Sequence, residues 1–408
     1  MSISFNGVPI VGVSPEEVTE DLRMAVKRGV MRRSCWHQPV AQALIELGHD
    51  TSYPLAFWAH IPWYGPLEEF LHAETPQDAV SDILFNGPFD DPFFVVRDGA
   101  LINTSLRVHP SWISWTQRQL LLRARRLDTA GDGAWAGPRA QGVVDRMRYL
   151  ITADGYSRDG GSLSIRMLPE RWRSLDDLVQ GKLLSREAAD LLLAALQSGA
   201  TILVAGATGS GKTTLTAGVT QELAKAKRIV FVEDGGELPR GENTVHLEAN
   251  SEVVGAFSQA IRDTLRMKPN YTVVGEVRGG EAMALLQAAA TGHPGIGTIH
   301  AGDVQTALQN LERMAMIGLS AEAGGGGQAA AAIVRGLITS PAVSLNIVVI
   351  GRAPNGRRTV LELAEVSRQS GGISGDVYTT NALFRYDSSI DGLTRAGYVT
   401  QAWGVGQY

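Results

Sequence analysis

The pattern of apolar and polar residues becomes regular after residue 200. Short apolar runs typical of buried strands alternate there with longer segments of helical periodicity. The runs cover residues 201–205, 229–233, 271–276 and 297–300, and the helical segments begin at Gly211, near Val254 and at Gly280. Strands that alternate with helices in this way predict a parallel sheet with helices on both faces.

The first third of the chain has a mixed α/β pattern. Residues 80–87 and 92–99 read as strands, and the second is closed by an Asp-Gly turn. Residues 162–166 read as a further strand that Pro169 ends. Residues 14–33 and 117–127 have apolar residues at helical spacing. Tryptophan and proline occur in the stretches 56–66 and 110–115. The glycine- and aspartate-rich segment 128–137 reads as a loop.

A chain of 408 residues is long for a single core, so two domains are expected. Residues 174–186 read as a linker with a short helix, and Ser185 is placed as the N-cap of a helix over 186–197. The glycine run 324–327 predicts a flexible joint between two helices. The expected division is an N-terminal extension (1–75), a smaller α/β domain (76–173), the linker (174–186) and a nucleotide-binding domain (187–408).

Composition narrows the class of protein. A 44% hydrophobic and 19% charged chain is ordinary for a soluble globular protein, and a net charge of -5 gives no argument for bulk nucleic-acid binding. Cys35 is the only cysteine, so an intrachain disulfide is excluded and a reducing compartment is favoured. The start carries no signal-peptide pattern, and the apolar runs are far shorter than the roughly 20 residues that span a bilayer. We therefore expect a cytoplasmic protein, and any membrane association must be peripheral or through a partner.

The most specific motif lies between the first apolar run and the helix that follows it. It is a complete phosphate-binding loop, formed by Gly206, Ala207, Thr208, Gly209, Ser210, Gly211, Lys212 and Thr213, with Thr214 next in the helix. Its glycines allow backbone N–H groups to surround an anion. Lys212 would reach the β- and γ-phosphates of ATP and the Thr213 hydroxyl would bind Mg²⁺. A chance glycine-rich turn is the alternative, and the strand and helix on either side argue against it.

Carboxylates follow the next apolar run. Glu233 and Asp234 end that run and Glu237 lies close behind. Acids at the carboxyl end of a parallel strand project into the crevice where ligands bind, so they could hold Mg²⁺-bound water or orient an attacking water. The alternative is a solvated acidic turn.

Glu276 ends the apolar run 271–276, in the layout of a Walker B element without the usual preceding Asp. It is the candidate for polarising the attacking water or for coordinating Mg²⁺. Arg278 is a candidate charge sensor at the phosphates or at a subunit boundary. The alternative for Arg278 is a surface ion pair, with Glu281 as a partner.

Two histidines, His293 and His300, bracket a glycine-rich strand. A metal site is weakly supported, because no cysteine is near and the spacing does not place both on one helix face. Either imidazole could hydrogen-bond the γ-phosphate or the carboxylates and so report the nucleotide state. The alternative is a structural hydrogen-bonding role for each.

The string LRMKPNYTVVGEVRGGEAMALLQAAATGHPGIGTIHA, residues 265–301, resembles the traffic ATPases of type II secretion, type IV pili and type IV secretion. Residues 206–213 match the Walker A box of that family, 233–237 its Asp box, 275–276 its atypical Walker B and 293–300 its His box. The strand Leu-Ser-Ile-Arg at 163–166 and GEVRGGEA at 275–282 look like the Tad/Flp-pilus branch. The resemblance runs from about Asp82 to the C-terminus.

The resemblance implies a RecA-like P-loop NTPase domain joined to a smaller N-terminal α/β domain, assembled as a homo-oligomeric, hexameric ring. It implies ATP and Mg²⁺ as cofactors, and inner-membrane platform or channel proteins of a secretion or pilus machine as partners. Arginines of the N-terminal domain contact the phosphates in this family, and Arg166 matches that position better than Arg146. The catalytic candidates are then Lys212, Glu233, Glu276, Arg278, His300 and Arg166, with Thr213 and Glu276 as Mg²⁺ ligands.

The expected function is ATP hydrolysis that powers pilus assembly or secretion across a bacterial envelope, without direct nucleic-acid contact. Two alternatives remain open. One is a conjugative DNA-transfer or nucleic-acid translocase ATPase, which predicts DNA-stimulated turnover and a basic pore. The other is a non-catalytic nucleotide-binding assembly factor, against which the intact Lys212, Thr213 and Glu276 argue.

Overall fold

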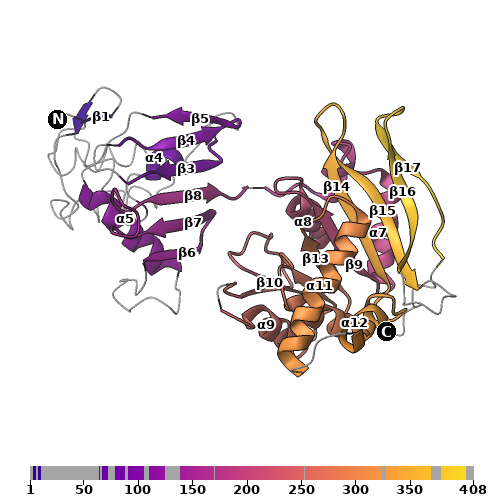
Figure 1. Cartoon of the computed structure of the whole chain (residues 1–408). Helices are drawn as coiled ribbons and strands as arrows, with labels where there is room; N and C mark the ends of the chain where they lie inside the picture. Colours follow the sequence, from indigo (N-terminus) through magenta and orange to yellow (C-terminus); the bar gives the residue numbers. More distant parts are fainter. Residues whose placement is uncertain are drawn as a thin grey trace. The chain divides into compact units, whose positions relative to one another are not determined.

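The computed structural model divides the chain into two compact units, Met1–Glu170 and Arg171–Tyr408 (Figure 1). The expected helix over 14–33, most of the stretch 56–66, the loop over 128–137 and the glycine run 324–327 lie outside the described residues. Within that description, no helix is long and apolar enough to cross a membrane. The structure describes residues 3–5, 8–10, 64, 67–71, 79–87, 91–104, 110–124, 138–169, 171–251, 253–323, 328–368 and 378–400.

The first unit contains an antiparallel sheet with the strand order β5-β4-β3-β8-β7-β6 (Figure 1). The strands expected at 80–87, 92–99 and 162–166 are confirmed, and Asp98 and Gly99 form the expected turn with φ of 51° and 79°. The sheet strands are β3 (Asp82–Phe85), β4 (Phe94–Arg97), β5 (Ala100–Asn103), β6 (Arg139–Val144), β7 (Met147–Thr152) and β8 (Leu163–Met167). The unit also has the paired strands β1 (Ile3–Phe5) and β2 (Val8–Ile10) and the short helix α4 (Glu68–Leu71).

Helix α5 (Pro110–Ala124) packs at the end of β7 and β8 in this unit. Its Gln117 amide donates to the carbonyls of Thr152 and Ser162, both at 3.2 Å. The helical spacing noted over 117–127 is confirmed as far as Ala124, and the helix begins earlier in the chain than that spacing. The helix begins at Pro110 because proline fits the first helical position, where its missing N–H is not needed.

The second unit is built on one mixed sheet, which has nine strands among the described residues, in the order β11-β10-β12-β13-β9-β14-β15-β16-β17. The expected parallel sheet is confirmed over β9 (Thr201–Gly206), β10 (Ile229–Glu233), β12 (Tyr271–Val274) and β13 (Gly295–Ile299). Two further parallel strands, β11 (Thr244–Glu248) and β14 (Leu345–Arg352), were not predicted. An antiparallel extension that the sequence pattern did not predict continues the sheet through β15 (Arg358–Arg368), β16 (Tyr378–Asp387) and β17 (Gly392–Arg395).

Helices cover both faces of this sheet, and two buried hydrophobic clusters lie beneath them. Ser185 caps α7 as expected, accepting from the Ala188 N–H at 3.3 Å, and Ser174 forms a capping box at the start of α6. One face carries α6 (Leu175–Gln180), α7 (Arg186–Gln197) and α8 (Lys212–Ala224). The other carries α9 (Ala256–Thr264), α10 (Glu281–Ala290), α11 (Val304–Ala323) and α12 (Gln328–Ile338).

Candidate active site

The phosphate-binding loop connects β9 to α8 at the carboxyl edge of the parallel strands. Gly209 and Gly211 have φ of 69° and 111°, a left-handed backbone that favours glycine, and Gly211 is the N-cap of α8. The N–H groups of Gly209, Gly211 and Lys212 donate to no backbone carbonyl of the described residues. Free N–H groups at the positive end of a helix dipole attract an anion.

The interior of the loop is shaped for a phosphate group. The Ser210 hydroxyl oxygen is buried and has no hydrogen-bond partner among the described residues. A Cβ on Gly206 would lie only 2.7 Å from the Ile350 carbonyl oxygen, so only glycine fits between the loop and β14. An unpaired buried hydroxyl costs free energy unless a ligand satisfies it, and a phosphate oxygen would do so.

Lys212 is folded into this loop. Its side chain is buried, and Nζ donates to the carbonyl oxygens of Gly206 at 2.9 Å and Ala207 at 3.0 Å. Nζ also lies 3.5 Å from Nδ1 of His300. Burial lowers the pKa of Lys212, and the negative charge of Glu276 opposes that shift. The ammonium group is therefore held at the centre of the loop, facing the carboxylate that follows β12.

Glu276 is the carboxylate opposite the loop. Its Oε2 accepts from Arg278 Nη2 at 2.5 Å. Its Oε1 lies 2.6 Å from His300 Nε2, within ion-pair distance, and accepts no hydrogen bond from the described residues. Burial acts to raise the pKa of Glu276, while the hydrogen bond and charge of Arg278, with the charges of His300 and Lys212, outweigh burial and lower it. Glu276 thus stays ionised, with one oxygen available to accept a proton from a water.

The structure shows which partners Arg278 has. Its guanidinium pairs with Glu276 and remains 56% exposed, whereas Glu281 accepts instead from the backbone N–H groups of Arg278 and Gly279. Glu281 therefore fixes the loop before α10. The Arg278 side chain lies at the edge of the site, and its role as a charge sensor stays a prediction.

Glu233 occupies a different environment. Its carboxylate is buried, Oε1 accepts from the Leu238 N–H at 2.9 Å, and Oε2 lies 3.2 Å from Nδ1 of His246. The His246 ring stacks on Phe231 with a centroid separation of 4.4 Å. Both oxygens of Glu233 therefore have structural partners, and its neighbour Asp234 accepts a hydrogen bond from the Ser251 hydroxyl. A catalytic role for Glu233 stays a prediction.

The two histidines lie at opposite edges of the sheet. His300 follows the carboxyl end of β13, beside the phosphate-binding loop, whereas His293 precedes the amino end of that strand. A strand of this length, rising about 3.3 Å per residue, separates them, so His293 cannot join His300 at the site. Asn310 of α11 donates to the His300 carbonyl at 2.9 Å and helps to position it.

The candidate arginines of the N-terminal region belong to the first unit. Arg166 lies on β8 with an exposed side chain, directly opposite Asp82 on β3 and Arg148 on β7. Arg146 lies in the turn before β7, and its carbonyl accepts from the Leu168 N–H at 2.6 Å. Contact of either arginine with phosphate stays a prediction.

No group of three or more His, Cys, Asp or Glu side chains in the described part of the chain is arranged to hold a metal ion. Mg²⁺ in phosphate-binding sites is held by one or two protein oxygens together with the substrate's phosphates. The Thr213 hydroxyl, at the first turn of α8, and Glu276 Oε1 are the candidate oxygens here, and their binding of Mg²⁺ stays a prediction.

Sequence reasoning missed His246 and Asn310. Neither lies in a motif: His246 comes from edge strand β11, and Asn310 lies one helix away from the histidine that it supports. Both act through contacts between segments that are far apart in the sequence, so no local pattern marks them.

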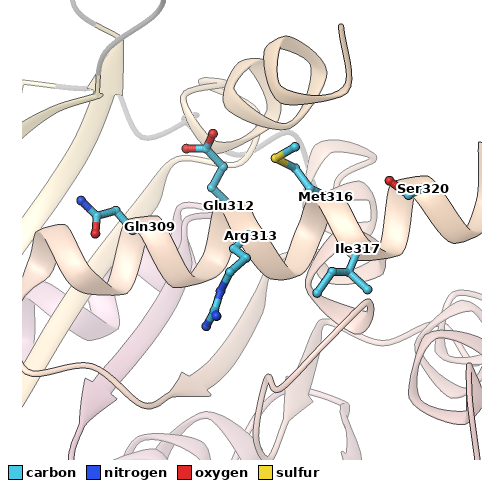
Figure 2. A pocket seen from close by; sticks show the side chains of 6 residues that line it. All are labelled: Gln309, Glu312, Arg313, Met316, Ile317 and Ser320. Atoms are coloured by element: carbon cyan, nitrogen blue, oxygen red, sulfur yellow. The ribbon is translucent and has the colours of Figure 1, made fainter. Parts of the chain in front are cut away.

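A hollow of about 630 Å³ lies along α11 (Figure 2). The Glu312 side chain, at its wall, accepts from Arg335 at 2.8 Å and from the Tyr378 hydroxyl at 2.6 Å. This network ties α11 to α12 and β16, which is a structural role. The hollow contains no residue of the phosphate-binding loop and does not include Glu276. It is lined by Gln309, Glu312, Arg313, Met316, Ile317 and Ser320.

A phosphate-binding loop at the carboxyl edge of a helix-covered parallel sheet, facing an ionised glutamate, defines a RecA-like P-loop nucleoside triphosphatase domain. The fold matches a solved structure of the pilus retraction motor PilT with bound ADP, with a TM-score of 0.53 and 21% identity over 73% of this chain and 80% of that one. That likeness concerns the fold alone.

Comparison of sequences gives the family. Residues 152–370, more than half of the chain, match the family described as type II/IV secretion system protein. A putative conjugal transfer protein of Mycobacterium tuberculosis is 33% identical over 320 residues, 76% of this chain and 85% of that protein. The type IV secretion system protein PtlH of Bordetella pertussis is 40% identical over 136 residues, 31% of this chain and 40% of that protein. The chain belongs to the type II/IV secretion system protein family and is an ATPase of the secretion and pilus class.

Proposed function

We propose that this chain is the ring-forming, ATP-driven motor of a bacterial envelope machine, with the phosphate-binding loop and Glu276 as its catalytic centre. The observation that carries the proposal is the position of Glu276. Its Oε1 is buried, lies 2.6 Å from His300 Nε2 and accepts no hydrogen bond from the described residues, while Lys212 occupies the loop opposite. Such a carboxylate can orient a water for attack on the γ-phosphate.

In this mechanism the loop N–H groups and Lys212 hold the phosphates, and the Glu276 carboxylate accepts a hydrogen bond from the attacking water. His300 and Arg278 keep Glu276 ionised and oriented. Mg²⁺, when bound by Thr213 and the phosphates, offsets the phosphate charge. Loss of the γ-phosphate changes the contacts of Lys212, Glu276 and His300, which can drive a movement of the surrounding segments.

The machine that this motor serves is a secretion or conjugation apparatus in our proposal, because the relatives reported above are named conjugal transfer and type IV secretion proteins. We also propose that the chain attaches peripherally to the inner membrane through channel proteins of that apparatus. Assignment to the Tad/Flp-pilus branch stays a prediction.

The experiment is the ATPase rate measured against protein concentration, with mass photometry on the same samples and Lys212→Ala as the blank. Activity that rises as an oligomer of ring size forms supports an interfacial motor. Full activity in a monomer contradicts the ring. Stimulation of the rate by single- or double-stranded DNA would favour a nucleic-acid translocase instead.

A further inference from the structure

The β14–β15 hairpin lies beside the phosphate-binding loop. β14 runs parallel to β9, and Ile350 is in register with Gly206, the first glycine of the loop. β15 returns antiparallel, with Arg358 opposite Arg352 at the end of β14. Because the second strand of an antiparallel pair starts where the first ends, Arg358 lies at the carboxyl edge of the parallel strands, where nucleotide binds.

Arg358 lies next to the loop. Its Cδ is 3.9 Å from the position that a Cβ on Gly211 would take, so the side chain borders the last glycine of the loop. The side chain is exposed, and its guanidinium has neither a hydrogen bond nor an ion pair within the described ranges.

The neighbouring arginines have partners within the described residues. Arg357 pairs with Asp391 at 2.6 Å, and Arg352 donates to the Gly356 carbonyl at 2.8 Å. Arg385, on β16, lies 3.4 Å from Glu362. Arg358 therefore differs from them in two respects: it is unpaired, and it lies against the anion-binding loop.

The strand order indicates which part of a nucleotide Arg358 would meet. β12 and β13, which lead to Glu276 and His300, flank β9 on one side, and β14 and β15 flank it on the other. The γ-phosphate would lie on the Glu276 side. Arg358 is on the opposite flank of β9, away from Glu276.

We propose that Arg358 is a nucleotide-binding residue whose guanidinium contacts the phosphates that ATP and ADP share. The inference rests on the proposed nucleotide site and adds a residue to it. A guanidinium forms charge-assisted hydrogen bonds with phosphate oxygens in a fork geometry that lysine cannot reproduce. The contact holds before and after hydrolysis, so Arg358 retains ADP as well as ATP.

The test is equilibrium binding of fluorescent ADP, and of fluorescent ATP in a Glu276→Gln background that prevents turnover. We compare the unsubstituted chain with Arg358→Ala, Arg358→Lys and the matched control Arg385→Ala, with thermal unfolding as a check of the fold. We expect Arg358→Ala to raise both dissociation constants by a similar factor of about 10, as the loss of one charge-assisted hydrogen bond predicts. Arg358→Lys should give dissociation constants between those of the unsubstituted chain and Arg358→Ala. Arg385→Ala should bind both nucleotides with the affinity of the unsubstituted chain.

Unchanged affinity in a folded Arg358→Ala protein overturns the inference and leaves a solvated surface arginine. A loss confined to ATP also overturns it, because it would place Arg358 at the γ-phosphate. These outcomes are distinct from failure of the proposed motor: a chain that binds nucleotide without hydrolysing it refutes the motor and leaves the Arg358 comparison valid. A chain that binds neither nucleotide refutes both.

Discussion

Gly318, within α11, lies directly against the backbone of Gly280, the residue before α10. A Cβ on Gly280 would lie 3.0 Å from the Gly318 Cα, and a Cβ on Gly318 would lie 2.9 Å from the Met283 Cβ and closer still to the Gly280 carbonyl oxygen. Gly280 ends the loop that carries Glu276 and Arg278. Because α11 also holds the His300 carbonyl through Asn310, one helix supports both segments that surround the catalytic carboxylate.

Gly318→Ala is expected to separate α11 from this loop. The added methyl group meets backbone and a fixed Cβ rather than a flexible side chain, so the fold must shift. We expect a loss of about 1–3 kcal/mol in the free energy of unfolding, the usual cost of overpacking, together with a lower kcat. Denaturant unfolding and steady-state ATPase assays measure the two effects.

The matched control is Gly336→Ala in α12, where a Cβ would meet nothing within 4 Å. Alanine is favoured over glycine in a helix by up to about 1 kcal/mol, so this variant should be as stable as the unsubstituted chain or more stable. Equal effects of the two substitutions would show that the contact with Gly280 does not matter.

Glu276→Gln should bind ATP normally and lose turnover by about 100-fold or more, because the amide cannot accept a proton from the attacking water. Nucleotide affinity and single-turnover hydrolysis separate binding from chemistry. Glu222→Gln is the control, since Glu222 pairs with Lys225 on the exposed side of α8 and should not affect the rate. If Glu276→Gln still hydrolyses ATP at the normal rate, Glu276 is not the residue that orients the attacking water.

The ionisation of Glu276 should contribute to stability with a defined pH dependence. Burial raises its pKa, but Arg278, His300 and Lys212 outweigh burial and hold the pKa below the ordinary 4.5. A carboxyl with a lowered folded-state pKa stabilises the fold above its unfolded-state pKa, and that contribution is lost as the pH falls through the folded-state value.

The measurement is the difference in free energy of unfolding between the unsubstituted chain and Glu276→Gln. This difference should stay constant from neutral pH down to about 5. On further acidification the unsubstituted chain should lose stability relative to Glu276→Gln. A gain in its relative stability as the pH falls would mean that the pKa of Glu276 is raised instead.

Glu233 should prove more important for stability than for chemistry. Glu233→Ala leaves the buried N–H of Leu238 without its acceptor, and we expect a loss of about 1–3 kcal/mol. Glu233→Gln keeps one acceptor oxygen and should cost less. Chemical denaturation of both variants tests this, and a stable Glu233→Gln protein with turnover as low as that of Glu276→Gln would restore Glu233 as a catalytic residue.

Much of the fold was predictable because its signals are local. Apolar runs separated by helical periodicity predicted the parallel strands β9, β10, β12 and β13, and Ser185 marked the start of α7. The antiparallel extension β15–β17 was not predicted. Its strands have partly exposed and irregular patterns, with register shifts at Val349/Ile350 and Leu363/Ala364 that interrupt simple alternation.

The sequence by itself determined the phosphate-binding loop and the acid after β12, because a bound phosphate and a strand end each require specific residues at fixed spacing. Tertiary structure alone decided which candidates meet. It placed His300 beside Glu276 and His293 at the far edge of the sheet. It also placed His246 beside Glu233 and Arg358 beside Gly211. These contacts join segments far apart in the chain, and they depend on strand order and register, which no local pattern encodes.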